Sequence, residues 1–150
     1  MDRERIATLV RMFNSTRRTE IDAAWTFARS MGDDLLPLLA EAFPQISKSP
    51  GRASILAYVG RFSRESEIVF RMGIASVQDR SYKVRHYACA ILAYSLRTDA
   101  LPTLSSLLNH ADPRTVEDAR AALDAIKNMN HHFFMDRDHS GKVLWEYGTT

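Results

Sequence analysis

The chain lacks residues on which several classes of protein depend. Its single cysteine, Cys89, excludes an intramolecular disulfide. Cys89 lies in the apolar stretch YACAILAY, where we expect a small core residue rather than a reactive thiol. No apolar run approaches the roughly 18 residues that a membrane-spanning helix needs, and the charged stretch MDRERIATLVRMF lacks the apolar centre of a signal peptide. We therefore expect a cytoplasmic protein with no membrane partner.

The sequence motifs of common enzyme classes are also missing. We find no Gly-rich phosphate loop, no His-Glu zinc motif and no nucleophile elbow. The adjacent carboxylates Asp33 and Asp34 directly precede the apolar run LLPLLAEAF, where capping a helix is a better explanation than catalysis. The net charge of +2 and the pI of about 8.9 allow a basic patch without requiring a nucleic-acid partner. We therefore expect a non-enzymatic protein without a cofactor.

What the sequence does contain is a regular series of amphipathic segments. Hydrophobic residues make up 45% and charged residues 25% of the chain, the composition of one ordinary globular domain. Apolar residues such as Val84 and Ala88 recur at helical spacing, and Asp112 is placed to cap a helix that starts at Pro113. Polar breaks predict eight helices of about 10 to 16 residues. The breaks are 14–19, 31–34, 47–51, 63–66, 78–81, 97–99 and 110–114.

The eight predicted helices form four pairs that repeat along the chain. Ala24, Ile55, Ala88 and Ala119 occupy equivalent places in the second helix of each pair, at separations of 31, 33 and 31 residues. A period in this range is typical of a helical solenoid, in which each pair buries its apolar face by stacking on the next pair. The repeat therefore predicts an all-α protein.

The pairs resemble HEAT repeats, most closely in the third pair, residues 67–98. The matching positions there are Asp79, Val84, Arg85, Ala88, Leu92 and Ala93; the fourth pair matches at Pro102, Ala119, Ala122 and Leu123 but has Val116 in place of the arginine. The second pair matches the HEAT pattern at Arg52, Val59 and Gly60, and its Pro37 lies one place out of register. The first pair matches the pattern poorly. The resemblance covers about residues 4–128 and implies a right-handed α-solenoid of about four HEAT-like pairs. We expect this repeat domain over 1–130, followed by a tail over 131–150 that packs on the last repeat.

Several polar and aromatic residues of these helices are candidates for structure or for recognition. The resemblance implies structural roles for Asp79, Arg85 and Pro102, with bonds to the backbone and to neighbouring repeats. Basic residues interleaved with aromatic ones can bind an acidic protein or a phosphate backbone, whereas a solvated basic face over an aromatic core is the simpler explanation. The candidate partner-binding residues are Trp25, Arg52, Tyr58, Arg85, Tyr87 and Tyr94.

The stretch DRDHSGKVLWE, from Asp136 to Glu146, could be a metal site. Calcium loops place oxygen ligands at the first, third and fifth positions, Gly at the sixth and Glu at the twelfth. Here the glutamate is at the eleventh position and Tyr147 at the twelfth, which disfavours calcium. A transition-metal site could be built from four nearby side chains, but adjacent histidines diverge on most backbones. Those four are His132, Asp136, Asp138 and His139.

A β-hairpin explains the same stretch with fewer coincidences. FFM and VLWEY have the composition of strands, and Gly141 in the DHSGK turn suits a left-handed backbone conformation. Packing of Phe133, Phe134, Leu144 or Trp145 against the last helix pair would let this hairpin cap the solenoid. A contact surface for a partner on the same hairpin is compatible with that cap.

The residues together favour recognition over chemistry. The first hypothesis is a non-enzymatic, HEAT-like protein-binding module that acts as an adaptor or as an inhibitor of another protein, of which a toxin-neutralising immunity protein is one form. The second hypothesis is nucleic-acid binding through the arginine-rich helix face. A metal-dependent or other enzyme is the third.

Overall fold

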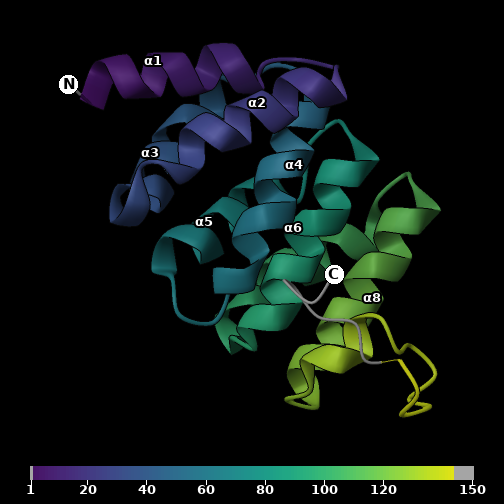
Figure 1. The fold of residues 1–150 in the computed structure, drawn as a ribbon. Helices are drawn as coiled ribbons and strands as arrows, with labels where there is room; N and C mark the ends of the chain where they lie inside the picture. Colours follow the sequence, from purple (N-terminus) through teal and green to yellow (C-terminus); the bar gives the residue numbers. More distant parts are fainter. Residues whose placement is uncertain (1, 144–150) are drawn as a thin grey trace. The chain divides into compact units, whose positions relative to one another are not determined.

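The computed structural model describes residues 2–143, and all the regular secondary structure within them is helical (Figure 1). None of these helices is both long and apolar enough to cross a membrane. The prediction of an all-α protein with eight helices is therefore confirmed for this part of the chain. The helices are α1 (Asp2–Phe13), α2 (Arg18–Arg29), α3 (Leu35–Ala42), α4 (Ser49–Val59), α5 (Glu67–Ser76), α6 (Tyr82–Ser95), α7 (Leu101–Ser105) and α8 (Pro113–Lys127).

The helix ends follow the polar breaks of the sequence. Asp112 caps α8 as predicted, because its carboxylate accepts the backbone N–H of Arg114 at 2.9 Å and Pro113 is the first helical residue. Asp34, by contrast, caps nothing with its side chain and pairs with Arg5 of α1 at 3.3 Å. Helices α3 and α7 have only 8 and 5 residues, shorter than predicted. Both are extended by 3₁₀ turns, namely η1 (Gly32–Asp34), η2 (Phe43–Gln45), η4 (Thr98–Ala100) and η5 (Ser106–Asn109).

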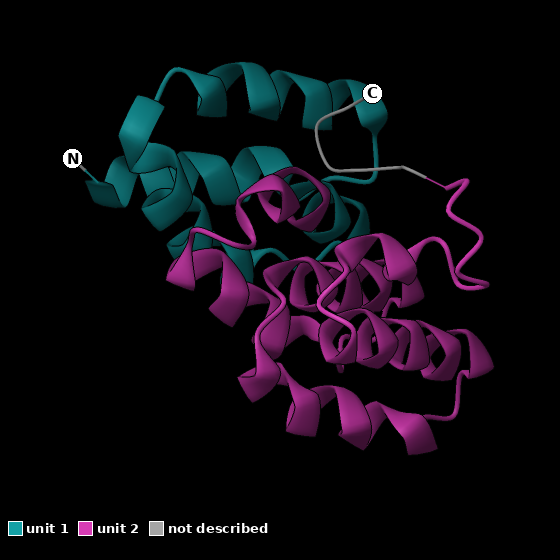
Figure 2. Cartoon of the chain, turned by 90° about the horizontal axis from the view of Figure 1, so that it is seen from below, with its two compact units in different colours: residues 1–55 teal, residues 56–150 magenta. Residues whose placement is uncertain are grey.

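The chain divides into two compact units, residues 1–55 and 56–150 (Figure 2). In the first unit α1 packs against α2 and α3 around the fully buried Leu9, Phe13 and Leu39. The Trp25 ring meets Phe13 edge-on at 4.8 Å between centroids, and its indole N–H donates to Ser54 Oγ at 2.8 Å. Because these contacts bury both aromatic rings, α2 is held to the start of α4 by packing and by a directed hydrogen bond.

Helix α6 is the centre of the second unit. It packs against α5 on one side and against α8 on the other, and every residue from 88 to 95 is buried. A helix that is apolar on all sides has to lie inside the fold rather than on its surface. Cys89 is part of this interior, which confirms the expectation of a core cysteine, and burial raises the pKa of its thiol to about 12.

The C-terminal segment is helical where the sequence predicted a strand. His131–Phe134 form the 3₁₀ turn η6, whose first residues are capped by the Asn130 side chain accepting from His132 N at 3.0 Å. Met129 adopts a φ of 50°, which turns the chain sharply after α8. The predicted strand FFM is therefore wrong. The predicted strand VLWEY falls almost wholly outside the described residues, as do Leu144 and Trp145.

The first part of the tail, η6, nevertheless packs against α8 and α6 (Figure 1). Phe134 is fully buried there, with its ring 5.5 Å from that of His86. The sequence predicted that Phe134 could pack against the last helix pair from a hairpin. The residue does pack there, but from a 3₁₀ turn. The Gly141 backbone has a φ of 75°, which confirms the left-handed conformation expected for this glycine.

Gly51→Ala tests the closest backbone approach in the first unit. A Cβ at this position would lie 1.9 Å from the Phe13 carbonyl oxygen, so the α1 end has to move. Alanine raises helix propensity by only about 1 kcal/mol, and we expect a net destabilisation of about 2 kcal/mol or more in urea unfolding. Gly73→Ala should cost less, because its nearest contacts are side-chain atoms of Ile91 and Leu92 that can rotate. An unchanged midpoint for Gly51→Ala would contradict the packing described.

Phe134→Ala tests how strongly the tail stabilises the second unit. The substitution leaves a cavity the size of a buried ring, and we expect a loss of about 3 to 5 kcal/mol in the free energy of unfolding. Met135→Ala is the matched control, because the neighbouring side chain is 38% exposed and should cost at most about 1 kcal/mol. Equal effects in the two variants would mean that Phe134 does not anchor the tail.

Candidate functional site

Arg85 connects the third helix pair to the fourth. Its guanidinium is buried and donates to the backbone oxygen of Asp79, to Thr115 Oγ1 and to Asp112 Oδ2, each at 2.8 Å. Hydrogen bonds from Arg114, together with the charge of Arg85, lower the pKa of Asp112 to about 2. These contacts to the backbone and to the next pair are of the structural kind that the HEAT resemblance implies for Arg85.

The turn before α6 uses Asp79 in a second way. Asp79 Oδ1 accepts the backbone N–H of Ser81 at 2.8 Å, which closes the turn directly ahead of the helix. Pro102 lies at the exposed start of α7, where the missing N–H costs nothing. Both residues therefore shape helix ends.

Three of the predicted partner-binding residues are not available to a partner. Trp25, Arg52 and Arg85 are only 6 to 7% exposed, and their polar atoms bond within the chain. Arg52 donates to the backbone oxygens of Ile46 and Ser47, at 3.3 and 2.5 Å. Burial and internal bonding disfavour the predicted partner-binding role of these three residues. The sequence could not show this, because an arginine or tryptophan has the same helical spacing whether its side chain bonds to solvent or to a neighbouring loop.

The aromatic candidates in the second unit are placed differently. Tyr58 and Tyr87 are half-buried, and the Arg61 guanidinium stacks on the Tyr58 ring at 4.2 Å from its centroid. Tyr94 is 7% exposed but borders a pocket. The structure thus leaves these three tyrosines within reach of a surface.

Asp118 is a buried acidic residue of the second unit with three hydrogen-bonding side chains around it. Its carboxylate, 3% exposed, accepts Tyr82 Oη–H at 3.0 Å and Arg137 Nη2–H at 2.8 Å, and lies 2.9 Å from His86 Nδ1. Burial alone would raise its pKa, but the hydrogen bonds from His86 and Arg137 outweigh burial and hold the pKa below its usual value. Burial and the Asp118 charge raise the pKa of Tyr82 to about 12, so the phenol remains a donor.

This arrangement connects three elements of the second unit. A carboxylate beside an imidazole can orient a general base. Here the same carboxylate is also bound by Arg137 of the tail, whose Nε–H donates to the Phe134 backbone oxygen at 2.9 Å. One carboxylate therefore holds α6, α8 and the tail together.

The DRDHSGK loop wraps around the carboxylate of Asp136. Asp136 is 3% exposed; Oδ1 accepts from Ser140 N and Oγ at 2.9 and 2.7 Å, and Oδ2 accepts from Gly141 N at 2.8 Å. The Ser140 hydrogen bonds lower the pKa of Asp136, with further help from Gly141 N–H. The carboxylate thus organises a turn with bonds from within the loop.

The same loop does not assemble the predicted metal site. His139 lies 2.5 Å from Asp124 Oδ2 through Nε2 and stacks on Phe133, while Asp138 points into solvent. Nowhere in residues 2–143 do three His, Cys, Asp or Glu side chains gather closely enough to hold a metal ion. The metal site considered from His132, Asp136, Asp138 and His139 is therefore not formed, since these side chains have other partners or diverge.

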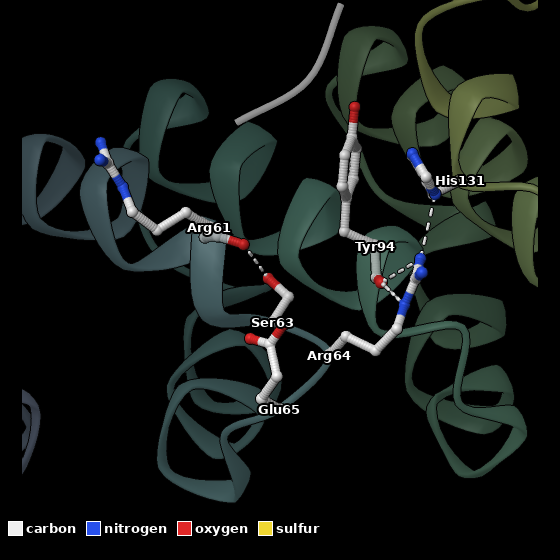
Figure 3. Close-up of a pocket in the computed structure, with 7 residues that line it drawn as sticks. Arg61, Ser63, Arg64, Glu65, Tyr94 and His131 are labelled. Atoms are coloured by element: carbon white, nitrogen blue, oxygen red, sulfur yellow. Dashed lines mark hydrogen bonds between the residues drawn. The ribbon is translucent and has the colours of Figure 1, made fainter. Parts of the chain in front are cut away.

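A small pocket lies where the end of α4, the end of α6 and the tail meet (Figure 3). The 3₁₀ turn η3 (Gly60–Phe62) and the residues after it form one side, with Ser63 Oγ donating to the Gly60 oxygen at 2.5 Å. Tyr94 and His131 form the other side, with rings 4.7 Å apart. The pocket has a volume of about 200 Å³.

Arg64 connects the two sides of this pocket. Its Nε and Nη2 donate to the Tyr94 backbone oxygen at 3.3 and 3.1 Å, which satisfies a carbonyl at the end of α6. Nη2 also lies 3.0 Å from His131 Nδ1. A guanidinium can only donate, so Nδ1 accepts and the imidazole proton is on Nε2. The pocket therefore contains cationic donors, an imidazole N–H and the edge of a tyrosine.

Two further charged residues, Arg61 and Glu65, line the outer side of the pocket. Arg61 donates through Nε to the Tyr58 oxygen at 2.9 Å, and Figure 3 shows its guanidinium directed away from Arg64. Within the described part of the chain, neither Arg61 nor Glu65 forms an ion pair. The sequence did not point to Arg64 or Glu65, since both lie in a polar break. It pointed to His131 only as a possible metal ligand and not as a neighbour of Arg64, which is 67 residues away.

Asp118→Asn tests how much the hydrogen bonds of Asp118 stabilise the fold and how this stabilisation depends on pH. Breaking a buried charge network should cost about 3 kcal/mol near neutral pH. Because the folded pKa is depressed, the carboxylate stabilises the fold above its unfolded pKa of about 4, and this contribution disappears as the pH falls through the folded pKa. We expect the variant to lose less stability than the wild type between about pH 5 and pH 2. The control is Glu117→Gln, at an exposed position paired with Arg120, which should change the dependence of stability on pH little. If stability depends on pH in the same way in Asp118→Asn and the wild type, the Asp118 carboxylate does not stabilise the fold as described.

Known proteins offer no guide to this site. In comparisons with protein-family models, curated proteins and solved structures, no match to the chain was found. The function has to be argued from the residues and contacts described above.

Proposed function

We propose that this chain is a HEAT-like, non-enzymatic module that binds another protein, as an adaptor or as an inhibitor. Its helix pairs would stack as a right-handed solenoid and its second unit would present the recognition pocket. A toxin-neutralising immunity protein is one form of inhibitor compatible with this proposal.

The repeat pattern supports the HEAT-like part of the proposal. Ala24, Ile55, Ala88 and Ala119, which recur at the same place in each helix pair, are all 0% exposed. A repeat unit needs small or apolar side chains at such positions because neighbouring helices pack against them. Arg85 adds a bond from one pair to the next, through Thr115 and Asp112.

The observation that carries the binding part is the pocket around Arg64, Tyr94 and His131. Its volume of about 200 Å³ is below the roughly 300 to 1,000 Å³ of small-molecule sites. A space of this size suits one side chain of a partner. Arginine and tyrosine are also the residues most enriched among energetically dominant interface contacts.

The arginine-rich face is less suited to nucleic acid than its composition indicates. Arg52 and Arg85 are buried, Arg18 pairs with Asp22 at 3.3 Å, and Arg97 pairs with Glu67 and Asp99. A phosphate backbone binds by releasing counterions from unpaired cations. These four cations, already buried or paired within the chain, therefore contribute little to such binding.

Capture from native lysate, analysed by mass spectrometry, tests the proposal with the full-length chain as bait. We expect Arg64→Ala to reduce recovery of a specific protein about tenfold, as loss of a dominant interface contact does. Arg61→Ala should have a smaller effect, because this guanidinium points away from the pocket centre.

The matched control is Arg120→Ala, an exposed arginine of α8 that pairs with Glu117. It should leave recovery unchanged. Equal recovery by the wild type and Arg64→Ala would contradict the pocket. Capture of nucleic acid instead, lost steeply as salt is added, would favour the alternative.

A further inference from the structure

A second, larger pocket lies in the first unit, where α1 ends and both α2 and α4 begin. Its volume is about 440 Å³, within the range of ligand sites. Three cationic residues line it, namely Arg11 of α1, Arg17 just before α2 and Lys48 just before α4. The stretch 11–17 and the remote Lys48 therefore bring positive charge to one concave place.

These three cations share one pocket and have no bonded counter-charge within the described chain. Arg11, Arg17 and Lys48 form no side-chain hydrogen bond or ion pair within residues 2–143. Some exposed arginines elsewhere lie beside a carboxylate, as Arg18 does beside Asp22, whereas Arg29 is exposed without such a partner and lies away from this pocket. Gathering like charges without counter-charges costs free energy, and an anion in the pocket would remove that cost.

The other polar groups of the pocket also favour an anion. Asn14 Oδ1 accepts three hydrogen bonds, from Ser47 N, Ser47 Oγ and Lys48 N, which leaves the amide N–H groups of Asn14 as further donors. Glu20 is the one acidic residue of the lining, and its Oε1 accepts from Ser15 Oγ at 2.6 Å. The formal charge of the lining is thus +2, from three cations and one carboxylate.

We propose that this pocket binds a phosphomonoester. The group carries a charge near −2 with three strong acceptor oxygens, which matches the charge of the lining and its excess of donors. Two guanidinium groups provide planar pairs of N–H donors for phosphate oxygens, and a lysine adds a point charge. The volume left beside a phosphate accommodates part of its carrier. This proposal does not rest on the function proposed for the second unit.

Isothermal titration calorimetry of the full chain at low salt tests the proposal. The probes are inorganic phosphate, a phosphoserine peptide and a nucleoside monophosphate. We expect saturable binding of at least one probe, and the tightest probe identifies the carrier. Arg11→Gln and Lys48→Met should each weaken binding about tenfold, the loss expected for one charged hydrogen bond. Glu20→Gln should tighten binding, because it removes the only negative charge of the lining.

Arg29→Gln is the control for general electrostatics. Arg29 is an exposed cation at the far end of α2 and does not line the pocket. Its replacement should leave the affinity unchanged. The proposal is overturned if no probe binds saturably, or if Arg29→Gln weakens binding as much as Arg11→Gln does. Since the exchanged side chains are exposed, melting curves should show every variant folded.

Discussion

The second unit depends on one buried charge, the carboxylate of Asp118. A carboxylate removed from water is tolerated only where donors replace its hydration. Here the donors come from α6, through Tyr82 and His86, and from the tail, through Arg137. Neither element can move away without leaving a charge unpaired in the interior. The tail is therefore fixed in place by electrostatics as well as by the buried ring of Phe134.

This constraint reaches the pocket through the chain itself. His131 begins the 3₁₀ turn that ends at Phe134, three residues before Arg137. Fixing Phe134 and Arg137 therefore fixes His131 against Tyr94 and within reach of Arg64. A recognition pocket gains affinity when its groups are held in position before the partner arrives, since less conformational entropy is then lost on binding. Under the proposed function, the hydrogen bonds of Asp118 would supply that preorganisation.

The sequence predicted what depends on local pattern and missed what depends on tertiary partners. Helix number, breaks and the Asp112 cap follow from periodicity and capping chemistry over a few residues. The 3₁₀ turn of the tail does not, because FFM has strand composition and the Asn130 cap with the left-handed Met129 overrides it. The pocket was also out of reach, since Arg64 and His131 are 67 residues apart.

The burial of Arg85 shows why the role of a basic residue is hard to predict from the sequence. In a helical pattern, an arginine on a solvated face and one that binds the next repeat have the same spacing; only the position of an acceptor distinguishes them. Where carboxylate or carbonyl oxygens surround an arginine, as they surround Arg85, its guanidinium forms hydrogen bonds that stabilise the fold. Where cations gather without acceptors, as Arg11, Arg17 and Lys48 do, the fold gains nothing from them. The proposed phosphate site is therefore argued from cations that the fold leaves unbonded, whereas the charge of Arg85 stabilises the fold itself.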